Sequence, residues 1–407
     1  MADFFQTLIA TIAVGSLYAL VALGYTLVYG VLKFINFAHS DIFVLGAWTS
    51  FTTATVILTR MGIDAEHAPW WVGVVVLFSA IGVCATTGYL IERFAYRPLR
   101  KAPRLNVLIT AIGVSLLLQN VGQLPGITVA SKDGQPLATV PFGPTPKSMP
   151  VLLPDMVLNE TTEATGVASG GSKRGVVKLD KAITLHPDRN YRLELTKTVN
   201  GEPDIEQLNV AMDAGTYEAG AELATQPRRS AQDVEGTSFK LVLAPIVPIR
   251  LLDVLIVGSS LALMAALQLL VFKTKLGTGM RALSYNIETA SLMGVNTNFV
   301  ISFTFIVGTS LAACAAFLYP MKYPGLNQTA HGVWVLLGLK AFVAAVVGGI
   351  GNIRGAVLGG FLIAAIEFFG ARYVSTELRD VYVFGLLILV LLVRPNGLLG
   401  TAVREKV

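Results

Sequence analysis

Four polar side chains lie close together in a stretch that is otherwise apolar enough to cross a membrane. Within "YTLVYGVLKFINFAHSDIFVLGAW", residues 25–48, the sequence places Asn36, His39, Ser40 and Asp41. An amide, an imidazole, a hydroxyl and a carboxylate can all hydrogen-bond to a polar solute. Because polar groups inside a membrane segment are costly, they generally face a water-filled cavity or a partner. We therefore expect these four residues to lie along the path of a transported solute.

Two local structures fit this stretch. A helix broken near residues 31–38 would place Asn36 and His39 beside a helix N-terminus, which attracts negative charge. Transporters use such discontinuous helices at their substrate sites. The alternative is a loop over residues 33–41, with Asp41 as the N-cap of the next span. In both cases the four residues lie at or beside the mouth of a path.

The rest of the chain offers little that points to catalysis. The phosphate-binding pattern G-x-x-x-x-G-K-[ST] and the metalloprotease pattern H-E-x-x-H are both missing from the sequence. The histidines are scattered, so we expect no metal site. His39 and Asp41 are two residues apart and would point in different directions on a helix, which disfavours an intramembrane enzyme. Basic patches interleaved with aromatic residues, typical of nucleic-acid binding, do not occur.

Composition indicates which elements position these residues. The 407-residue chain is 53% hydrophobic and 14% charged, with a mean hydropathy of +0.63, whereas soluble domains average about 25% charged residues. A spanning helix needs about 20 mostly apolar residues. The chain is therefore expected to be an all-α polytopic membrane protein with about eight or nine transmembrane helices. The windows are 5–30, 40–59, 70–92, 105–125, 251–272, 298–319, 333–350, 355–373 and 380–394.

Three further features complete the expected topology. The windows at 333–350 and 355–373 are short and Gly-rich, so they are either full crossings or a re-entrant or broken pair. The first window lacks a basic flank and a cleavage site, which favours a retained span over a signal peptide. Cationic loops stay in the cytoplasm, and the loop after the third span is crowded with cations (Arg93, Arg97, Arg100, Lys101 and Arg104). Alternation from this loop predicts nine crossings, an external N-terminus and a cytoplasmic C-terminus.

A polar segment, residues 126–249, divides the transmembrane domain into parts 1–125 and 250–407. Residues 176–212 alternate apolar and polar residues with period two, which is typical of strands, and Asn200-Gly201 is a hairpin signal. Residues 159–175 are polar and Gly/Ser-rich, which favours a flexible stretch. We expect a small β-rich domain on the external, periplasmic side, either as a decorative insertion or as a docking surface for a soluble partner.

A second constellation follows the fifth span. Residues 273–298 form an amphipathic stretch on the expected cytoplasmic side, with small and apolar residues at helical spacing and Gly294 as a C-cap. A cytoplasmic helix over about 277–294 with these residues exposed would dock a soluble partner. The alternative is an interfacial helix that lies on lipid.

The third constellation is "GGIGNIRGAVLGG", residues 348–360. Gly351, Gly355 and Gly359 are four apart, so on a helix they form a smooth face that lets another backbone approach closely. A tight re-entrant turn is the alternative. Further along, Glu367 is a lone carboxylate in apolar sequence and is expected to face a partner or a cavity.

These three stretches, in this order, resemble the permease family of branched-chain amino acid ABC transporters, of the LivH type. "GYTLVYGVLKFINFAHS" matches a family segment near the N-terminus. The cytoplasmic helix motif is matched at Gly277, Arg281, Ala282, Ala290, Met293 and Gly294, the Gly-rich segment at residues 340–360, and the closing "RPxGLxG" at residues 394–400. The likeness covers about 1–125 and 250–407. Two departures stand out: Ser40 replaces the usual glycine, and the 126–249 segment has no counterpart in the usual family member.

The resemblance also implies the other subunits of the transporter. The chain would be a non-catalytic permease of the bacterial inner membrane, paired with a second, related permease of the LivM type. Two cytoplasmic ATPase subunits, which use ATP and Mg, would drive transport, and a periplasmic binding protein would deliver substrate. This chain would bind no cofactor. The residues expected to couple to the ATPase are Arg281, Ala282, Asn286, Ala290, Met293 and Gly294.

The resemblance implies branched-chain or other hydrophobic amino acids as substrates. Urea and short-chain amide importers use close relatives of this permease, so they are the alternative within the same class. A passive channel is the alternative from a different class, although a cytoplasmic docking helix argues against it.

Overall fold

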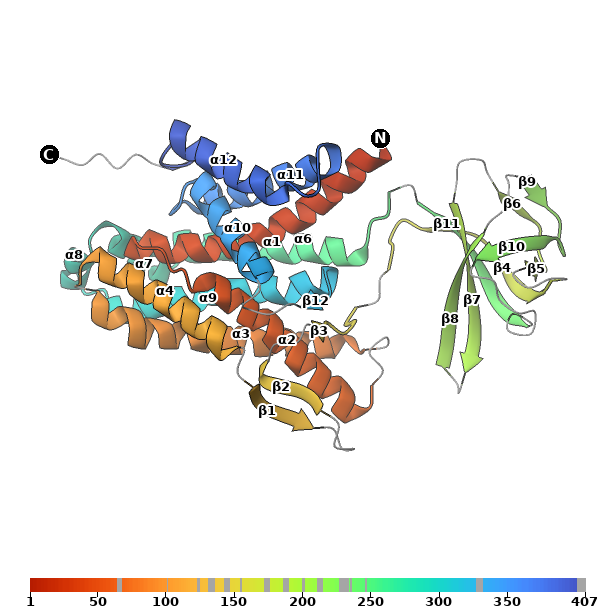
Figure 1. The fold of residues 1–407 in the computed structure, drawn as a ribbon, viewed down its shortest axis with the longest axis horizontal. Helices are drawn as coiled ribbons and strands as arrows, with labels where there is room; N and C mark the ends of the chain where they lie inside the picture. The colour runs from red at the N-terminus through yellow and green to blue at the C-terminus, as the bar shows by residue number, and fades with distance from the viewer. Residues whose placement is uncertain are drawn as a thin grey trace. The chain divides into compact units, whose positions relative to one another are not determined.

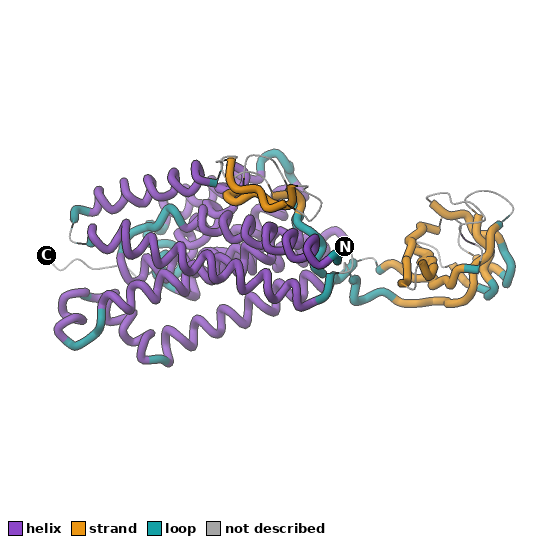
Figure 2. The backbone as a smooth tube through the Cα atoms, turned by 90° about the horizontal axis from the view of Figure 1, so that it is seen from below, coloured by secondary structure: helices purple, strands orange, loops and turns teal. Residues whose placement is uncertain are grey.

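The structure is a computed structural model of the chain. It describes residues 1–63, 68–100, 102–122, 125–130, 136–142, 147–153, 156–171, 176–185, 190–199, 202–210, 215–226, 234, 236–245, 247–326 and 332–400. The chain divides into two compact units. One unit, Thr7–Asp155 with Leu252–Val407, is mainly helical, and the other, Met1–Gln6 with Met156–Leu251, contains most of the strands (Figure 1, Figure 2).

The helices follow the apolar windows of the sequence closely. Their bounds are α1 (Ala2–Leu32), α2 (His39–Met61), α3 (Trp70–Leu90), α4 (Arg104–Val121), α6 (Leu251–Lys273), α7 (Lys275–Tyr285), α8 (Ile287–Leu292), α9 (Thr297–Lys322), α10 (Gly332–Gly348), α11 (Ile353–Tyr373) and α12 (Arg379–Val393). A π-helical turn, η2 (Ile91–Tyr96), and a 3-10 turn, η3 (Arg97–Leu99), extend α3.

Six of the described helices are long and apolar enough to cross a membrane: α1, α2, α3 with its extension, α6, α9 and α11. The apolar helices within α4 and α10 are shorter. α10 has 17 residues, which at about 1.5 Å per residue is about 26 Å, just under the thickness of a bilayer core of about 30 Å. The prediction of a helical, polytopic membrane protein is therefore confirmed.

Helices α1 and α9 lie at the centre of this unit. In the most apolar window of each helix, 78% of the residues of α1 and 72% of those of α9 are buried. The corresponding share is 28% for α3 and for α6. α2, α3 and α9 pack against one another, and α10 packs against α11. Since α1 ends at Leu32, immediately before the polar stretch, the most enclosed helix leads directly into the candidate site.

Close packing of α10 on α11 depends on glycine. A Cβ on Gly359 would overlap the carbonyl oxygen of Ala344, and one on Gly355 would overlap that of Gly348. At these two positions the backbones of α10 and α11 approach too closely for a larger residue. By contrast, Gly351 lies in the turn before α11 with a φ of +94°, a conformation that favours glycine. A helical interpretation of all three was wrong because the helix begins only at Ile353.

The β-rich unit contains a closed barrel with strand order β10-β5-β4-β11-β7-β8. Its strands are β4 (Thr161–Gly170), β5 (Val176–Leu179), β7 (Asn190–Val199), β8 (Glu202–Val210), β10 (Glu222–Gln226) and β11 (Thr237–Ala244). β6 (Ile183–Leu185) and β9 (Gly215–Tyr217) form a separate antiparallel pair. Alternating side chains such as Leu193, Leu195 and Leu241 fill a buried core. The period-two strands are thus confirmed, because polar residues face out between them.

Sequence and structure differ in two places within this segment. β4 runs through the Gly/Ser-rich stretch that was predicted to be flexible, because its backbone pairs with β5 and β11 on either side. The predicted turn residues Asn200 and Gly201 lie outside the described residues, but β7 and β8 pair up to Val199 and Glu202.

The compact β unit also begins later than the predicted boundary at residue 126. β1 (Pro125–Ala130) and β2 (Pro136–Phe142) form an antiparallel hairpin near α2 (Figure 1). β3 (Lys147–Ser148) pairs with β12 (Gly325–Leu326). These strands belong to the helical unit.

Candidate functional site

The polar stretch forms a short connection and the first turn of a helix. α1 ends at Leu32, Lys33 adopts a left-handed conformation with a φ of +58°, and α2 begins at His39. Lys33 is exposed, but the polar side chains that follow it are buried: Asn36 is 2% exposed and His39 is 0% exposed. Both predicted structures are therefore partly right, since a loop separates two helices, yet its polar side chains are buried within the helical unit.

Asn36 is held by the π-helical turn at the end of α3. Its Oδ1 accepts a hydrogen bond of 2.7 Å from the Tyr96 hydroxyl, and both side chains are buried. The Asn36 Nδ2 has no hydrogen-bond partner among the described residues. π-helical turns are rare and often occur at functional sites. Asn36 therefore keeps two free donor hydrogens at a fixed position.

His39 packs against α1. Its ring makes an edge contact with Tyr25, with centroids 4.5 Å apart. A Cβ on Gly24 would overlap the His39 ring, so only glycine fits beside it. The Val21 backbone lies nearby, but neither ring nitrogen makes a hydrogen bond of ordinary geometry to a described residue. An imidazole without strong partners can pair with a solute or a water.

Ser40 and Asp41 make contacts with other helices. The Ser40 hydroxyl donates to the Phe37 carbonyl at 3.0 Å, and Ser40 lies so close to α10 that a Cβ on Gly338 would overlap it. The Asp41 carboxylate accepts hydrogen bonds from Ser115 at 2.5 Å and Gln119 at 2.9 Å, both on α4.

The interpretation of Asp41 as an N-cap was wrong. The N-cap position of α2 is Ala38, and the carboxylate instead joins α2 to α4. Because His39 faces α1 and Asp41 faces α4, the two do not form an acid–base pair. Among the described residues, no group of three or more His, Cys, Asp or Glu is placed to hold a metal ion.

The predicted cytoplasmic helix is two helices. Asn286 has an extended backbone between α7 and α8, and its side chain accepts a hydrogen bond from the Thr289 N–H at 3.0 Å. Asn286 therefore ends one helix and caps the next, which the amphipathic pattern alone did not predict. Gly294 has a φ of +82° and ends α8 as expected. Arg281 and half-buried Ala282 lie on α7.

The exposed surface of this pair of helices differs from the prediction. Ala290 was expected on the docking face but is only 4% exposed, because α8 turns it toward the helical unit. The most exposed apolar side chains are Tyr285, Leu292 and Met293, which are 91%, 88% and 81% exposed, and Ile287 is 38% exposed. Of the predicted coupling residues, Met293 therefore has the most accessible apolar side chain.

Two buried charge networks were not predicted as sites. Lys340 Nζ lies 2.8 Å from Glu367 Oε1 and 2.8 Å from Asp380 Oδ1, and the Tyr18 hydroxyl donates to Glu367 at 2.9 Å. This network joins α1, α10, α11 and α12. The sequence analysis noted Glu367 but not its partner. Lys340, a lone cation within the apolar window 333–350, could have indicated that partner.

The second network lies at the end of α3. Glu92, which is 0% exposed, accepts hydrogen bonds from Ser302 at 2.5 Å and from Arg100. Arg100 also donates to Asn298 at 2.7 Å. The network joins η2 and Arg100, the residue after η3, to α9. Because Tyr96 belongs to η2, the network also supports the contact with Asn36.

Comparison with known proteins finds similar sequences in one family of permeases. A family model described as "Branched-chain amino acid transport system / permease component" matches residues 7–144 and 210–391, which leaves 145–209 unmatched. The high-affinity branched-chain amino acid transport system permease protein BraD of Pseudomonas aeruginosa is 34% identical over 405 residues, covering 99% of this chain and 98% of the relative. LivH of Escherichia coli K12 is 31% identical over 404 residues, with the same coverage.

Other comparisons are narrower. The autoinducer 2 import system permease protein LsrC of Yersinia enterocolitica is 33% identical over 112 residues, which is 26% of this chain and 30% of the relative. No solved structure matches the chain. Since the family model matches most of the chain and the first two relatives align along nearly all of it, the chain belongs to the family of branched-chain amino acid transport system permease components.

Proposed function

We propose that this chain is the transmembrane subunit of an ABC importer that moves branched-chain or other hydrophobic amino acids from periplasm to cytoplasm. The observation that carries the proposal is the end-to-end similarity to two permeases named for branched-chain amino acid transport. The helical architecture agrees with a multi-pass inner-membrane permease.

ATP hydrolysis belongs to partner subunits in this proposal. The sequence lacks a P-loop, whereas α7 and α8 expose Tyr285, Leu292 and Met293. Exposed apolar side chains on short helices suit a protein interface. We assign this surface to an ATPase subunit, with Arg281 and Asn286 shaping it. A second, LivM-type permease completes the pore, and a periplasmic binding protein supplies the substrate.

The topology follows from the cationic loops. We place the N-terminus and the β unit in the periplasm and the C-terminus in the cytoplasm, with nine crossings that include the shorter helices α4, α10 and α12. α10 and α11 then form a helical hairpin across the bilayer. The barrel core is filled by side chains, which supports a role as a surface for a soluble partner rather than as a carrier of a small ligand.

The substrate path runs beside Asn36, His39, Ser40 and Asp41. Free polar atoms on Asn36 and His39 support this assignment, because a zwitterion needs donors and acceptors when it leaves water. Asp41 has a positioning role, since α4 already occupies its carboxylate.

Uptake by cells tests the proposal. A host that lacks its own branched-chain amino acid uptake would express this chain with its co-purifying partner subunits, and uptake of labelled leucine, valine, urea and acetamide would be compared. We expect saturable, energy-dependent uptake of leucine and valine that is lost without this chain. Uptake of urea or acetamide alone would favour the amide importer, and energy-independent equilibration would indicate a channel.

A further inference from the structure

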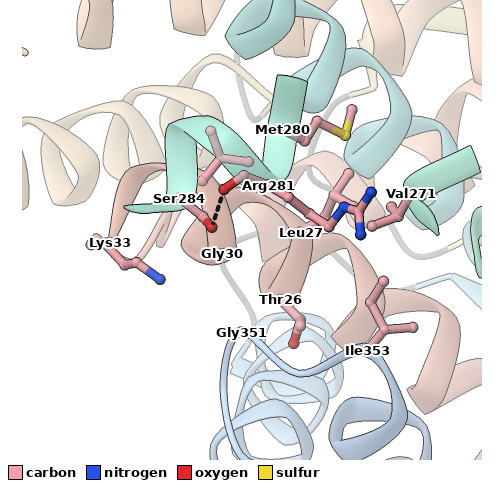
Figure 3. A pocket seen from close by; sticks show the side chains of 11 residues that line it. Thr26, Leu27, Gly30, Lys33, Val271, Met280, Arg281, Ser284, Gly351 and Ile353 are labelled. Carbon is pink, nitrogen blue, oxygen red and sulfur yellow. Dashed lines mark hydrogen bonds between the residues drawn. The ribbon is translucent and has the colours of Figure 1, made fainter. Parts of the chain in front are cut away.

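A pocket of about 120 Å³ lies where the end of α1 meets α7. The end of α6 and the turn before α11 complete its walls (Figure 3). It is separate from the substrate path proposed above, since neither Asn36 nor His39 lines it. Most of the lining is apolar, and the polar side chains are Thr26, Lys33, Arg281 and Ser284.

Both cations of this pocket lack an ion-pair partner among the described residues. Neither Lys33 nor Arg281 forms an ion pair with any residue in the described part of the chain. The Arg281 guanidinium lies over the Phe272 ring, 5.5 Å from its centroid, and makes one long hydrogen bond of 3.4 Å to Thr278. An arginine fixed in this way keeps most of its N–H donors for a ligand. No Asp or Glu is among the lining residues, so the pocket carries net positive charge.

A buried hydroxyl also lacks a partner. Thr26 is 1% exposed, and its Oγ1 makes no hydrogen bond to a described residue. Figure 3 shows its hydroxyl directed toward the turn that holds Gly351, just before Ile353. Ile353 is the first residue of α11, whose N-terminus carries partial positive charge. By contrast, the Ser284 hydroxyl donates a hydrogen bond of 2.6 Å to the Arg281 carbonyl.

These features together indicate which class of ligand the pocket binds. Arginine and a helix N-terminus both favour phosphate, and basic pockets between membrane helices bind anionic lipid head groups. The apolar side chains of Leu27, Val271 and Met280 suit the start of an acyl chain. A zwitterionic amino acid fits less well, because its ammonium would lie near two cations. We propose that this pocket binds the phosphate of an anionic phospholipid between α1 and α7.

Native mass spectrometry of the purified full-length chain tests the site directly and does not depend on transport. Detergent-solubilised protein would be titrated with phosphatidylglycerol, phosphatidylcholine or inorganic phosphate. We expect one phosphatidylglycerol to be retained per chain, and retention to fall at least about tenfold in Arg281→Gln, because the variant loses a charged hydrogen-bond donor to the phosphate. Lys33→Gln should weaken retention as well.

Lys275→Gln is the matched control, because Lys275 is an exposed cation on α7 that does not line the pocket. Thr26→Val removes the free hydroxyl with little change of shape and should weaken retention without lowering the melting temperature. If the protein binds inorganic phosphate at millimolar concentration but retains no phosphatidylglycerol, the phosphate in this pocket comes from solution, and the assignment to a lipid is wrong. Equal retention of phosphatidylglycerol by Arg281→Gln and Lys275→Gln, or equal retention of phosphatidylcholine, would overturn the proposal.

Discussion

Replacing Lys340 with methionine removes an ammonium that lies 2.8 Å from Glu367 and 2.8 Å from Asp380. The Lys340 and Glu367 side chains are only 9% and 6% exposed, so the substitution would leave a buried carboxylate with the Tyr18 hydroxyl as its remaining hydrogen-bond donor among the described residues. Breaking a buried pair by removing one partner costs about 3–5 kcal/mol. The Asp380 side chain is 51% exposed. Loss of its ion pair with Lys340 therefore adds no more than about 1 kcal/mol to the destabilisation.

A double-mutant cycle separates the ion pair from general damage to packing. Glu367→Gln keeps the shape and the contact with Tyr18, and Lys340→Met with Glu367→Gln leaves no buried charge. We expect the double variant to be more stable than Lys340→Met alone by about 2 kcal/mol, because replacing both charges is far less costly than removing one. Asp380→Asn serves as the control and should cost about 1 kcal/mol or less.

The assay is reversible unfolding of the purified chain in mixed micelles, followed by circular dichroism, with denaturing detergent as the variable. Each variant would be compared at the same protein and lipid concentration. If Lys340→Met is as stable as the unmodified chain, or if the two single changes simply add, the interpretation of Lys340 and Glu367 as one buried network is refuted.

Three further predictions concern other parts of the chain. Tyr96→Phe leaves the buried Asn36 carbonyl oxygen without its donor, so it should lower stability by about 1–3 kcal/mol and reduce transport; unchanged transport and unfolding would contradict this. Leu292→Asp, on the exposed face of α8, should weaken ATPase co-purification while the permease stays folded, whereas Ala290→Asp should lower the yield of folded protein because Ala290 is buried; equal folding and ATPase binding in both would refute the assignment. Lys181→Cys should react with an impermeant thiol reagent from the periplasmic side of intact cells, since Lys181 is exposed and the native cysteines are buried; labelling only after lysis would reverse the topology.

Most helices and strand β7 could be predicted from the sequence, because apolar runs and period-two alternation are local patterns. The apolar windows became helices with ends within a few residues of the prediction, since an uninterrupted apolar run stays helical until a polar or Gly-rich segment follows. The same holds for β7, whose period-two pattern buries Leu193 and Leu195. β4 was missed because its polar, Gly-rich sequence becomes a strand only through pairing with β5 and β11.

The candidate site was predicted as a set of residues but not as a set of contacts. Asn36 and Tyr96 are 60 positions apart, and Asp41 finds its donors on α4, 74 and 78 positions away. No local pattern specifies such partners. The N-cap assigned to Asp41 failed for this reason: a carboxylate in a first turn usually indicates capping, but here packing of α2 on α4 provided better donors.

Transport in proteoliposomes tests the central claim most directly. The permease would be reconstituted with its second permease and ATPase subunits, and ATP-dependent accumulation of labelled leucine would be measured with substrate-loaded binding protein outside. We predict accumulation by the unmodified complex and severe loss with Asn36→Ala and with His39→Ala, while complex assembly and basal ATPase activity remain. If both variants accumulate leucine at the unmodified rate, the polar stretch does not line the path, and the account of this site is wrong.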